Sequence, residues 1–256
     1  MTTDLFDLTD RVAVVTGGSR GLGREMVLAF AQQGADVVIA SRKLDACAAL
    51  AREVEALGGR ALPVAYHAGE WDDSNRLYEQ VYEEFGRCDV LVNNAGMSPL
   101  YPSIDAIGEA LYDKVMGVNL KGPFRLSALV GTRMAGPDHG GSAGGSIIFV
   151  SSIAASRPGP NELVYGAAKA GVENLTYGLA RTLGPTVRVN CIAPGPFLTD
   201  ISRAWDLDAF RTAAKAGYAL GRGGEPNEIV GTALYLASDA SSYTTGAVIA
   251  VDGGPR

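Results

Sequence analysis

Short runs of apolar residues alternate along the chain with longer stretches in which apolar residues recur every three or four positions. The short runs are typical of buried strands, and they occupy 12–15, 36–40, 61–65, 90–93, 146–150, 187–192 and 247–251. The longer stretches predict helices over 24–33, 44–57, 74–85, 104–116 and 123–134, and a further helix that carries Tyr165 and runs toward Leu183.

This alternation of strands and helices favours an α/β fold with a parallel seven-stranded sheet and helices on both faces. The 256 residues, 47% of them hydrophobic, show no break in composition. We therefore predict a single Rossmann-like doubly wound domain over residues 1–256, which would bind ligands at the C-terminal ends of its strands. The glycine-rich patch 140–145 is interpreted as a surface loop without a function of its own.

Charge and rare residues exclude several classes of protein. A net charge of −6 argues against nucleic-acid binding, and no apolar stretch approaches the roughly 20 residues of a membrane span. The first ten residues are acidic and unlike a signal peptide, so we expect a cytoplasmic protein. Cys47, Cys88 and Cys191 are interpreted as small core residues in a reducing compartment. Because His67 and His139 form no cluster with metal-ligand spacing, we predict no metal site.

A glycine-rich turn follows the first predicted strand. The turn reads Thr16-Gly-Gly-Ser-Arg-Gly-Leu-Gly23, a Gly-x-x-x-Gly-x-Gly spacing that differs from the commoner Gly-x-Gly-x-x-Gly. Glycines between a strand and a helix let the backbone approach a pyrophosphate, which the free N–H groups of the helix then bind. A tight connection without a ligand is the alternative interpretation.

A second candidate site combines Ser152, Tyr165 and Lys169. Tyr165 and Lys169 stand four residues apart, so a helix places both side chains on one face. A neighbouring ammonium is expected to lower the pKa of the phenol from about 10, which suits a general acid or base. Ser152 could hydrogen-bond the same substrate oxygen. A solvated helix face is the alternative for the Tyr–Lys pair alone.

Together these motifs resemble the short-chain dehydrogenase/reductase (SDR) family over nearly the whole chain. The matching segments are Asn93-Asn94-Ala95-Gly96, Asn119, Ser152 thirteen residues before Tyr165, Pro194-Gly195, and the ending Val251-Asp-Gly-Gly254. The resemblance implies catalysis by Asn119, Ser152, Tyr165 and Lys169 with a nicotinamide dinucleotide. Asn119 would support a water-mediated proton relay to Lys169, although an Asn near a helix kink can also be purely structural.

The resemblance also implies which residues bind the cofactor. They are Gly17, Ser19, Arg20, Gly21, Leu22, Gly23, Ser41, Arg42, His67, Ala68, Asn94, Ala95, Gly96, Tyr165, Lys169, Pro194, Gly195, Phe197 and Thr199. The second strand is followed by Ser41, Arg42 and Lys43 without a carboxylate, which favours NADP(H) over NAD(H), with Arg20 as a second phosphate ligand. The alternative is that Arg42 caps a solvated edge.

The resemblance also predicts contacts with the adenine, the ribose and the carboxamide of the cofactor. His67 stands where relatives commonly carry an Asp that contacts the adenine amine. A ring stack from His67 or a backbone contact from Ala68 would replace that contact. The alternative is that His67 is only a partly buried loop residue. Asn94, Ala95 and Gly96 would lie beneath the ribose. Thr199, in the loop that begins at Pro194, would bind the carboxamide.

The reaction implied is hydride transfer between NADP(H) and a small carbonyl/alcohol substrate, with Tyr165 as the general acid/base. A substrate pocket would draw on 97–101, 153–163 and 197–224, and the last is predicted to be a lid, with an exposed helical pair as the alternative. Two other functions remain: a 3-oxoacyl-carrier-protein reductase, disfavoured because 182–187 offers no Lys or Arg, and a catalytically silent NADP(H)-binding regulator. The C-terminal run resembles relatives that form tetramers, so we expect a homotetramer.

Overall fold

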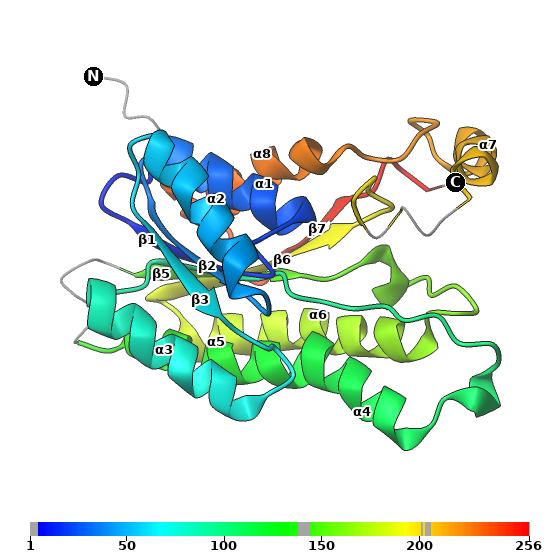
Figure 1. Cartoon of the computed structure of the whole chain (residues 1–256), viewed down its shortest axis with the longest axis horizontal. Helices are drawn as coiled ribbons and strands as arrows, with labels where there is room; N and C mark the ends of the chain where they lie inside the picture. Colours follow the sequence, from blue (N-terminus) through cyan, green and yellow to red (C-terminus); the bar gives the residue numbers. More distant parts are fainter. Residues whose placement is uncertain (1–4, 138–143, 201, 203–205, 256) are drawn as a thin grey trace.

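The computed structural model describes residues 5–137, 144–200, 202 and 206–255. A seven-stranded parallel sheet forms its centre, with the strand order β3-β2-β1-β4-β5-β6-β7 (Figure 1). The strands are β1 (Val12–Thr16), β2 (Asp36–Ser41), β3 (Ala61–Ala65), β4 (Val90–Asn93), β5 (Gly145–Val150), β6 (Val187–Pro194) and β7 (Val248–Val251). The predicted doubly wound α/β fold is confirmed.

Helices cover both faces of this sheet. One face carries α1 (Gly21–Gln32), α2 (Leu44–Ala56) and α8 (Val230–Ala237), and the other carries α3 (Trp71–Phe85), α5 (Gly122–Ala135) and α6 (Leu163–Leu183) (Figure 1). α4 (Glu109–Met116) leads through a π-helical segment, Gly117–Lys121, into α5. α7 (Leu207–Gly217) lies beyond the C-terminal ends of the strands.

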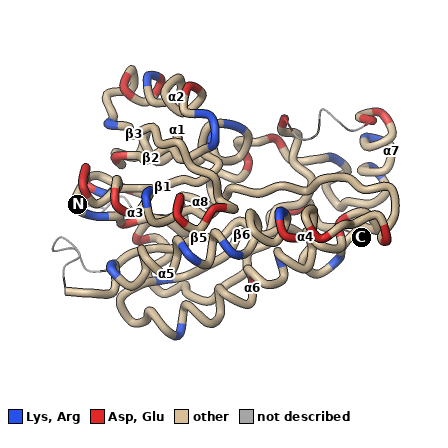
Figure 2. Tube along the Cα trace, turned by 60° about the horizontal axis from the view of Figure 1, so that its bottom comes forward, with Lys and Arg blue, Asp and Glu red and all other residues tan. Residues whose placement is uncertain are grey.

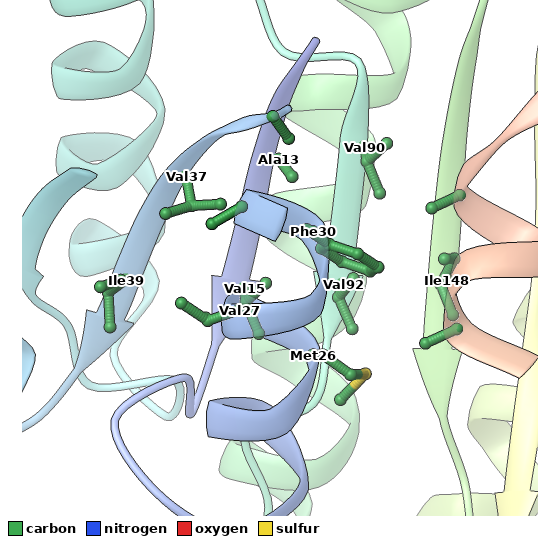
Figure 3. Packing of buried hydrophobic residues seen from close by; sticks show 14 of the residues in the cluster. Ala13, Val15, Met26, Val27, Phe30, Val37, Ile39, Val90, Val92 and Ile148 are labelled. Atoms are coloured by element: carbon green, nitrogen blue, oxygen red, sulfur yellow. The ribbon is translucent and has the colours of Figure 1, made fainter. Parts of the chain in front are cut away.

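The central strands are mostly apolar because both of their faces are covered. All five residues of β1 are buried, and its alternate side chains enter different clusters. Ala13 and Val15 face α1, where they meet Met26 and Phe30, as Figure 3 shows. Burying apolar side chains on both sides is what a central parallel strand requires. The strongly apolar runs in the sequence therefore predicted the strands well.

The helix boundaries show where the sequence pattern was insufficient. α1 begins at Gly21, inside the glycine turn, instead of at residue 24. The predicted helix 104–116 is divided into a 3₁₀ turn, Ile104–Ala106, and α4. α8 was not predicted, because its eight residues are too apolar to show a polar face. The patch 140–145 does not form a loop throughout, since Gly145 begins β5; residues 140–143 lie outside the described part of the chain.

The topology brings the sequence motifs to one edge of the sheet. All strands are parallel, and the chain reverses its direction of winding between β1 and β4. The glycine turn follows β1, Asn94 follows β4, Ser152 lies just beyond β5, and Gly195 follows β6. Ligands of open α/β sheets bind at the C-terminal ends of the strands at such a reversal.

Charge and burial add little else that points to a ligand. Lys and Arg residues lie among Asp and Glu residues on α2 and α7 (Figure 2). The three cysteines are buried and unpaired, as core residues would be. Within the described residues, no helix has the length and apolar character needed to cross a membrane. The same part of the chain holds no group of three metal-ligating side chains.

Candidate active site

The glycine turn places a helix N-terminus at the reversal point. Gly17 and Gly21 have φ angles of 65° and 54°, which disfavour other residues. A Cβ on Gly23 would lie 2.4 Å from the Gly17 carbonyl oxygen, so only glycine fits there. α1 has neither a side-chain cap at Arg20 nor an acidic residue in its first turn. Its N-terminal N–H groups therefore suit an anionic group, and the turn fits a dinucleotide pyrophosphate.

One hydroxyl, that of Thr16, joins the glycine turn to the turn after β4. The Thr16 hydroxyl accepts hydrogen bonds from the backbone N–H groups of Asn94 (3.0 Å) and Ala95 (3.1 Å) and donates one to the Val92 carbonyl (3.2 Å). The Asn94 amide donates in return to the carbonyls of Thr16 (2.9 Å) and Gly17 (3.3 Å). The two turns are thus fixed to each other, and no local pattern in the sequence indicated this role for Thr16.

Ser152, Tyr165 and Lys169 meet where β5 and α6 adjoin. Ser152 precedes a 3₁₀ turn, where its Oγ accepts from the Ala154 N–H (3.1 Å), and its side chain lies close enough to Tyr165 to act on the pKa of the phenol. The buried Lys169 Nζ donates to the Val150 carbonyl (2.8 Å) and lies 5.6 Å from the centre of the Tyr165 ring. The structure therefore brings the three predicted residues together.

Burial dominates the protonation of this pair. Burial raises the pKa of Tyr165 to about 12, although the hydrogen bond with Ser152 opposes that shift. Burial lowers the pKa of Lys169 to about 8. The expected lowering of the tyrosine pKa by its lysine neighbour is wrong for this structure. The physical reason is that the Lys169 ammonium is directed at the Val150 carbonyl and the phenol ring, while protein atoms desolvate the hydroxyl.

Asn119 is buried in the π-helical segment between α4 and α5. Its Oδ1 accepts from the Met97 N–H (3.2 Å), and its Nδ2 donates to the carbonyls of Met97 (2.9 Å) and Val115 (2.9 Å). A Cβ on Gly96 would lie 3.0 Å from this Oδ1 and 3.4 Å from the Lys169 Nζ. Asn119 thus lies beside the lysine, and its side chain holds the turn after β4, the structural role foreseen as the alternative.

The loop after β6 closes against the glycine turn. A Cβ on Gly21 would lie 3.6 Å from the Thr199 Cβ, so the two segments touch. The Gly195 N–H donates to the Val251 carbonyl (3.0 Å), and the close approach of Asp252 leaves no room for a side chain at Gly195. Phe197 is buried and pairs with Gly224. Thr199 therefore reaches the same edge as the glycine turn.

Comparison with known proteins agrees with this geometry. A family model described as enoyl-(acyl carrier protein) reductase matches residues 17–255. L-rhamnose 1-dehydrogenase (NAD(P)(+)) of Azotobacter vinelandii is 39% identical over 254 residues, which cover 96% of this chain and 97% of that protein. The 3-oxoacyl-[acyl-carrier-protein] reductase of Thermotoga maritima is 37% identical, with coverage of 96% and 98%.

A solved structure extends the likeness to the fold. A 7α-hydroxysteroid dehydrogenase complexed with NADH and 7-oxo glycochenodeoxycholic acid superimposes with a TM-score of 0.92 at 30% identity, covering 100% of this chain and 98% of that one. The chain is a short-chain dehydrogenase/reductase. As an SDR enzyme it is an NAD(P)-dependent oxidoreductase that acts on a CH–OH group.

The end of β2 in this SDR carries cations. The Ser41 hydroxyl accepts a hydrogen bond from the Ser19 hydroxyl (3.0 Å), which joins β2 to the glycine turn. The residues that follow these two serines, Arg20 and Arg42, are both exposed. Asp36, at the opposite end of the strand, pairs with Arg60 (3.3 Å). The first residues after β2 are Arg42 and Lys43, as the sequence indicated.

His67 and Ala68 are held within their own loop. The His67 Nδ1 accepts from the Gly69 N–H (3.2 Å), and its backbone N–H donates to Asp73 (2.9 Å). Ala68 is buried with its carbonyl against Gly122, where a Cβ would lie only 1.7 Å away. His67 thus has the partly buried loop environment that was the alternative, and its contact with adenine stays a prediction. Asp73 was not foreseen from the sequence.

An apolar recess opens beside Tyr165. It is lined by Pro99, Tyr101, Ile107, Leu111, Val115, Asn161, Val164 and Tyr165. Two of the three predicted pocket segments, 97–101 and 153–163, contribute to it, whereas the residues from α4 were missed. From the third segment, 197–224, Phe197, Leu220 and residues 222–224 instead line a second depression together with Val251–Gly253.

The predicted lid is only partly covered by the structure. Arg203 and Trp205 lie outside the described residues. Beyond α7, the N–H groups of Ala219 and Leu220 donate to the carbonyls of Gly254 (2.7 Å) and Gly253 (3.0 Å). The segment after α7 is therefore attached to the C-terminal ending, and closure over a substrate stays a prediction.

Proposed function

We propose that this SDR enzyme is an NADP(H)-dependent reductase, or the reverse dehydrogenase, for a small carbonyl/alcohol pair. The observation that carries the proposal is the position of Tyr165, which lies close to Ser152 and Lys169 and lines an apolar recess. A substrate oxygen at the Tyr165 hydroxyl would have both a proton donor and a second hydrogen-bond donor within reach.

The proposed roles follow from these contacts. In the reduction direction, the cofactor supplies the hydride. Tyr165 donates its proton to the substrate oxygen while Ser152 hydrogen-bonds the charge that develops there. Lys169 holds a buried positive charge beside the ring and binds the ribose hydroxyls of the cofactor. Asn119 lies next to Lys169 and supports proton transfer to it through water.

The cofactor residues are proposed in three groups. The glycine turn with Leu22 would hold the pyrophosphate, residues Asn94–Gly96 the ribose, and Pro194–Thr199 the carboxamide, as expected from the sequence. Preference for NADP(H) is supported by Ser41 at the end of β2 and Arg42 directly after it, with Arg20 exposed at the start of α1.

A second candidate is a 3-oxoacyl-carrier-protein reductase. It is favoured by the name of the Thermotoga relative, and the description of the matching family model also names an acyl-carrier-protein substrate. Residues 182–187 provide no Lys or Arg for an acidic carrier, so we place this function second. A catalytically silent regulator is disfavoured because the four catalytic side chains lie together.

We further propose one domain over residues 1–256, a lid around 197–224, a cytoplasmic location and a homotetramer. The tetramer is supported by the position of β7 at the edge of the sheet with partly exposed residues, since a second copy could cover this edge.

The decisive test is the substitution Tyr165→Phe, assayed by NADPH and NADH oxidation against a panel of ketones, aldehydes and an acyl-carrier substrate. We expect the wild type to reduce small ketones faster with NADPH and the variant to lose at least about a hundredfold in kcat. Retention of most activity by the variant would exclude Tyr165 as the proton donor. Faster turnover of the acyl-carrier substrate would favour the second candidate.

A further inference from the structure

Three ionisable residues of α6 share one side of the helix. Tyr165, Lys169 and Glu173 follow each other at intervals of four residues, so their side chains leave α6 in one stripe. α6 packs along β5 and β6 (Figure 1). The stripe therefore has a third member, Glu173, one turn beyond the two residues that are proposed to take part in the reaction.

The stripe contacts a short piece of chain at the end of β5. The Lys169 Nζ donates to the carbonyl of Val150, the last residue of that strand (2.8 Å). Tyr165 lies close to Ser152, two residues further on. The residue between these two contacts is Ser151, and its side chain is buried.

The Ser151 hydroxyl has one proton to donate and two acceptors within reach on α6. The Glu173 Oε1 lies 2.9 Å from the hydroxyl, and the Lys169 carbonyl lies 3.3 Å from it. A carboxylate is the stronger acceptor, and its distance is the shorter one, so the proton is directed at Glu173. Because Ser151 is only 3% exposed, water competes little for this proton.

The surroundings of this hydrogen bond hold Ser151 from two elements. The Ser151 N–H donates to the Ile192 carbonyl of β6 (2.7 Å), while its hydroxyl is bound to α6. Burial raises the pKa of the neighbouring Cys191 thiol on β6 to about 12, and the charge of Glu173 adds to that shift. The half-buried Glu173 carboxylate is thus on the side of α6 that faces the sheet.

We propose that Glu173 is a positioning residue, which through the Ser151 hydroxyl holds Ser152 in place for the reaction. The inference rests on the proposed function, because that function makes Ser152 the second hydrogen-bond donor to the substrate oxygen. Ser152 follows Ser151 directly, so a shift of Ser151 passes to it through a single planar peptide group. Small displacements of a group that acts on the substrate reduce the rate steeply, even where the substrate still binds.

The first experiment measures the reduction of 2,3-butanedione by NADPH. Glu173→Ala leaves the Ser151 hydroxyl only the longer contact, to the Lys169 carbonyl, and alanine preserves the helix. We expect kcat to fall about tenfold while the KM values for both substrates change less than about twofold. Glu173→Gln keeps an acceptor oxygen and should retain a kcat within about twofold of the wild type. Glu79→Ala, the same change at an exposed position within α3, is the control and should behave like the wild type.

Double variants test whether Glu173 acts through the two serines. Ser151→Ala should lower kcat as much as Glu173→Ala, and their combination should lower it no further, since both remove one hydrogen bond. Ser152→Ala should lower kcat strongly, and the addition of Glu173→Ala should then change nothing, because the group that Glu173 holds is gone. An unchanged kcat in Glu173→Ala, an equal loss in Glu173→Gln, or a further loss of about tenfold in the Ser152→Ala background would overturn the proposal.

Hydrogen–deuterium exchange separates this inference from the proposed function, because it needs no turnover. The amides of residues 148–155, followed by mass spectrometry, should exchange about fivefold faster in Glu173→Ala than in the wild type, Glu173→Gln or Glu79→Ala. Faster exchange in a protein that reduces no ketone would leave the tie correct and the reductase proposal wrong. Unchanged exchange in Glu173→Ala would show that Glu173 does not hold this segment, whatever the enzyme reduces.

Discussion

At the scale of single residues, burial acts on the two titratable groups of α6 in opposite directions. The neutral form is favoured in both, so the Tyr165 phenol keeps its proton while the Lys169 ammonium loses its proton more readily. A tyrosine that keeps its proton is ready to donate it, which suits the reduction direction. The oxidation direction requires the phenolate, so we expect the rate of oxidation to keep increasing with pH up to the raised pKa of Tyr165, about 12.

The buried lysine should leave a signature in the pH dependence of stability. Below pH 8 the folded protein holds a desolvated ammonium, whereas between pH 8 and 10.5 the unfolded chain binds the additional proton, so the unfolding free energy increases there with pH. The full contribution is about 3 kcal/mol, of which about 1 kcal/mol falls between pH 8 and 9. Lys169→Met should remove this increase.

Urea unfolding of the wild type and Lys169→Met at pH 7, 8 and 9 measures the difference. Cys191, whose pKa burial raises to about 12, affects both proteins and largely cancels in the comparison. Parallel curves for the two proteins would mean that Lys169 stays charged in the folded state over this range.

At the scale of elements, the site depends on how the ends of helices are attached. The Tyr101 hydroxyl accepts from Leu163, the first residue of α6, two residues before Tyr165. The glycine turn is attached in a similar way through Thr16 and Asn94. These ties join residues 62 and 78 positions apart, so no local sequence pattern could reveal them.

Tyr101→Phe tests the first of these ties. The variant leaves the Leu163 N–H and the Pro160 carbonyl without this partner, which should lower the unfolding free energy by about 1 kcal/mol and reduce kcat, because the start of α6 loosens. Tyr243→Phe removes the same hydroxyl from a fully exposed residue and should change neither quantity. Urea unfolding and steady-state kinetics measure both. Equal behaviour of the two variants would contradict a positioning role for Tyr101.

Gly23→Ala tests the glycine turn. The added Cβ would lie 2.4 Å from the Gly17 carbonyl and 2.6 Å from the Asn94 amide, so the turn must move, and we expect the Kd for NADPH to increase about tenfold or more. Gly178→Ala makes the same change within α6, where a Cβ meets nothing within 4 Å. That control should keep its affinity and gain about 0.5–1 kcal/mol of stability. Fluorescence titration with NADPH decides between the two outcomes.

At the scale of the whole molecule, apolar runs and the order of motifs were enough to predict the sheet, its parallel direction and the edge that carries the site. The proximity of Tyr165 and Lys169 also follows from helical spacing, because both belong to one continuous helix. The α4 wall of the recess could not be predicted, since Leu111 meets Tyr165 only through tertiary packing. The direction of the Tyr165 pKa shift was missed for the same reason, because burial cannot be read from neighbours in sequence.

The C-terminal ending holds the segment after α7 by hydrogen bonds, although the two are far apart in the sequence. Gly254 has a φ of 70°, and its carbonyl accepts from the Ala219 N–H (2.7 Å). Gly254→Ala should therefore strain the backbone, lower stability by about 1 kcal/mol and increase the KM for the ketone, because the α7 segment loses its attachment. Gly58→Ala is the control: it introduces a similar strain, at φ 88°, in a part of the sequence far from the ending. It should lower stability and leave the KM unchanged. An unchanged KM in Gly254→Ala would separate the ending from substrate binding.

The shared hydroxyl of Thr16 has a consequence for how a dinucleotide arrives and departs. Because this hydroxyl ties the turn after β1 to the turn after β4, beside strands that are already paired, we expect the two turns to move as one unit. We therefore expect a dinucleotide to enter and leave by movement of the segment that carries Thr199, while these two turns keep their positions.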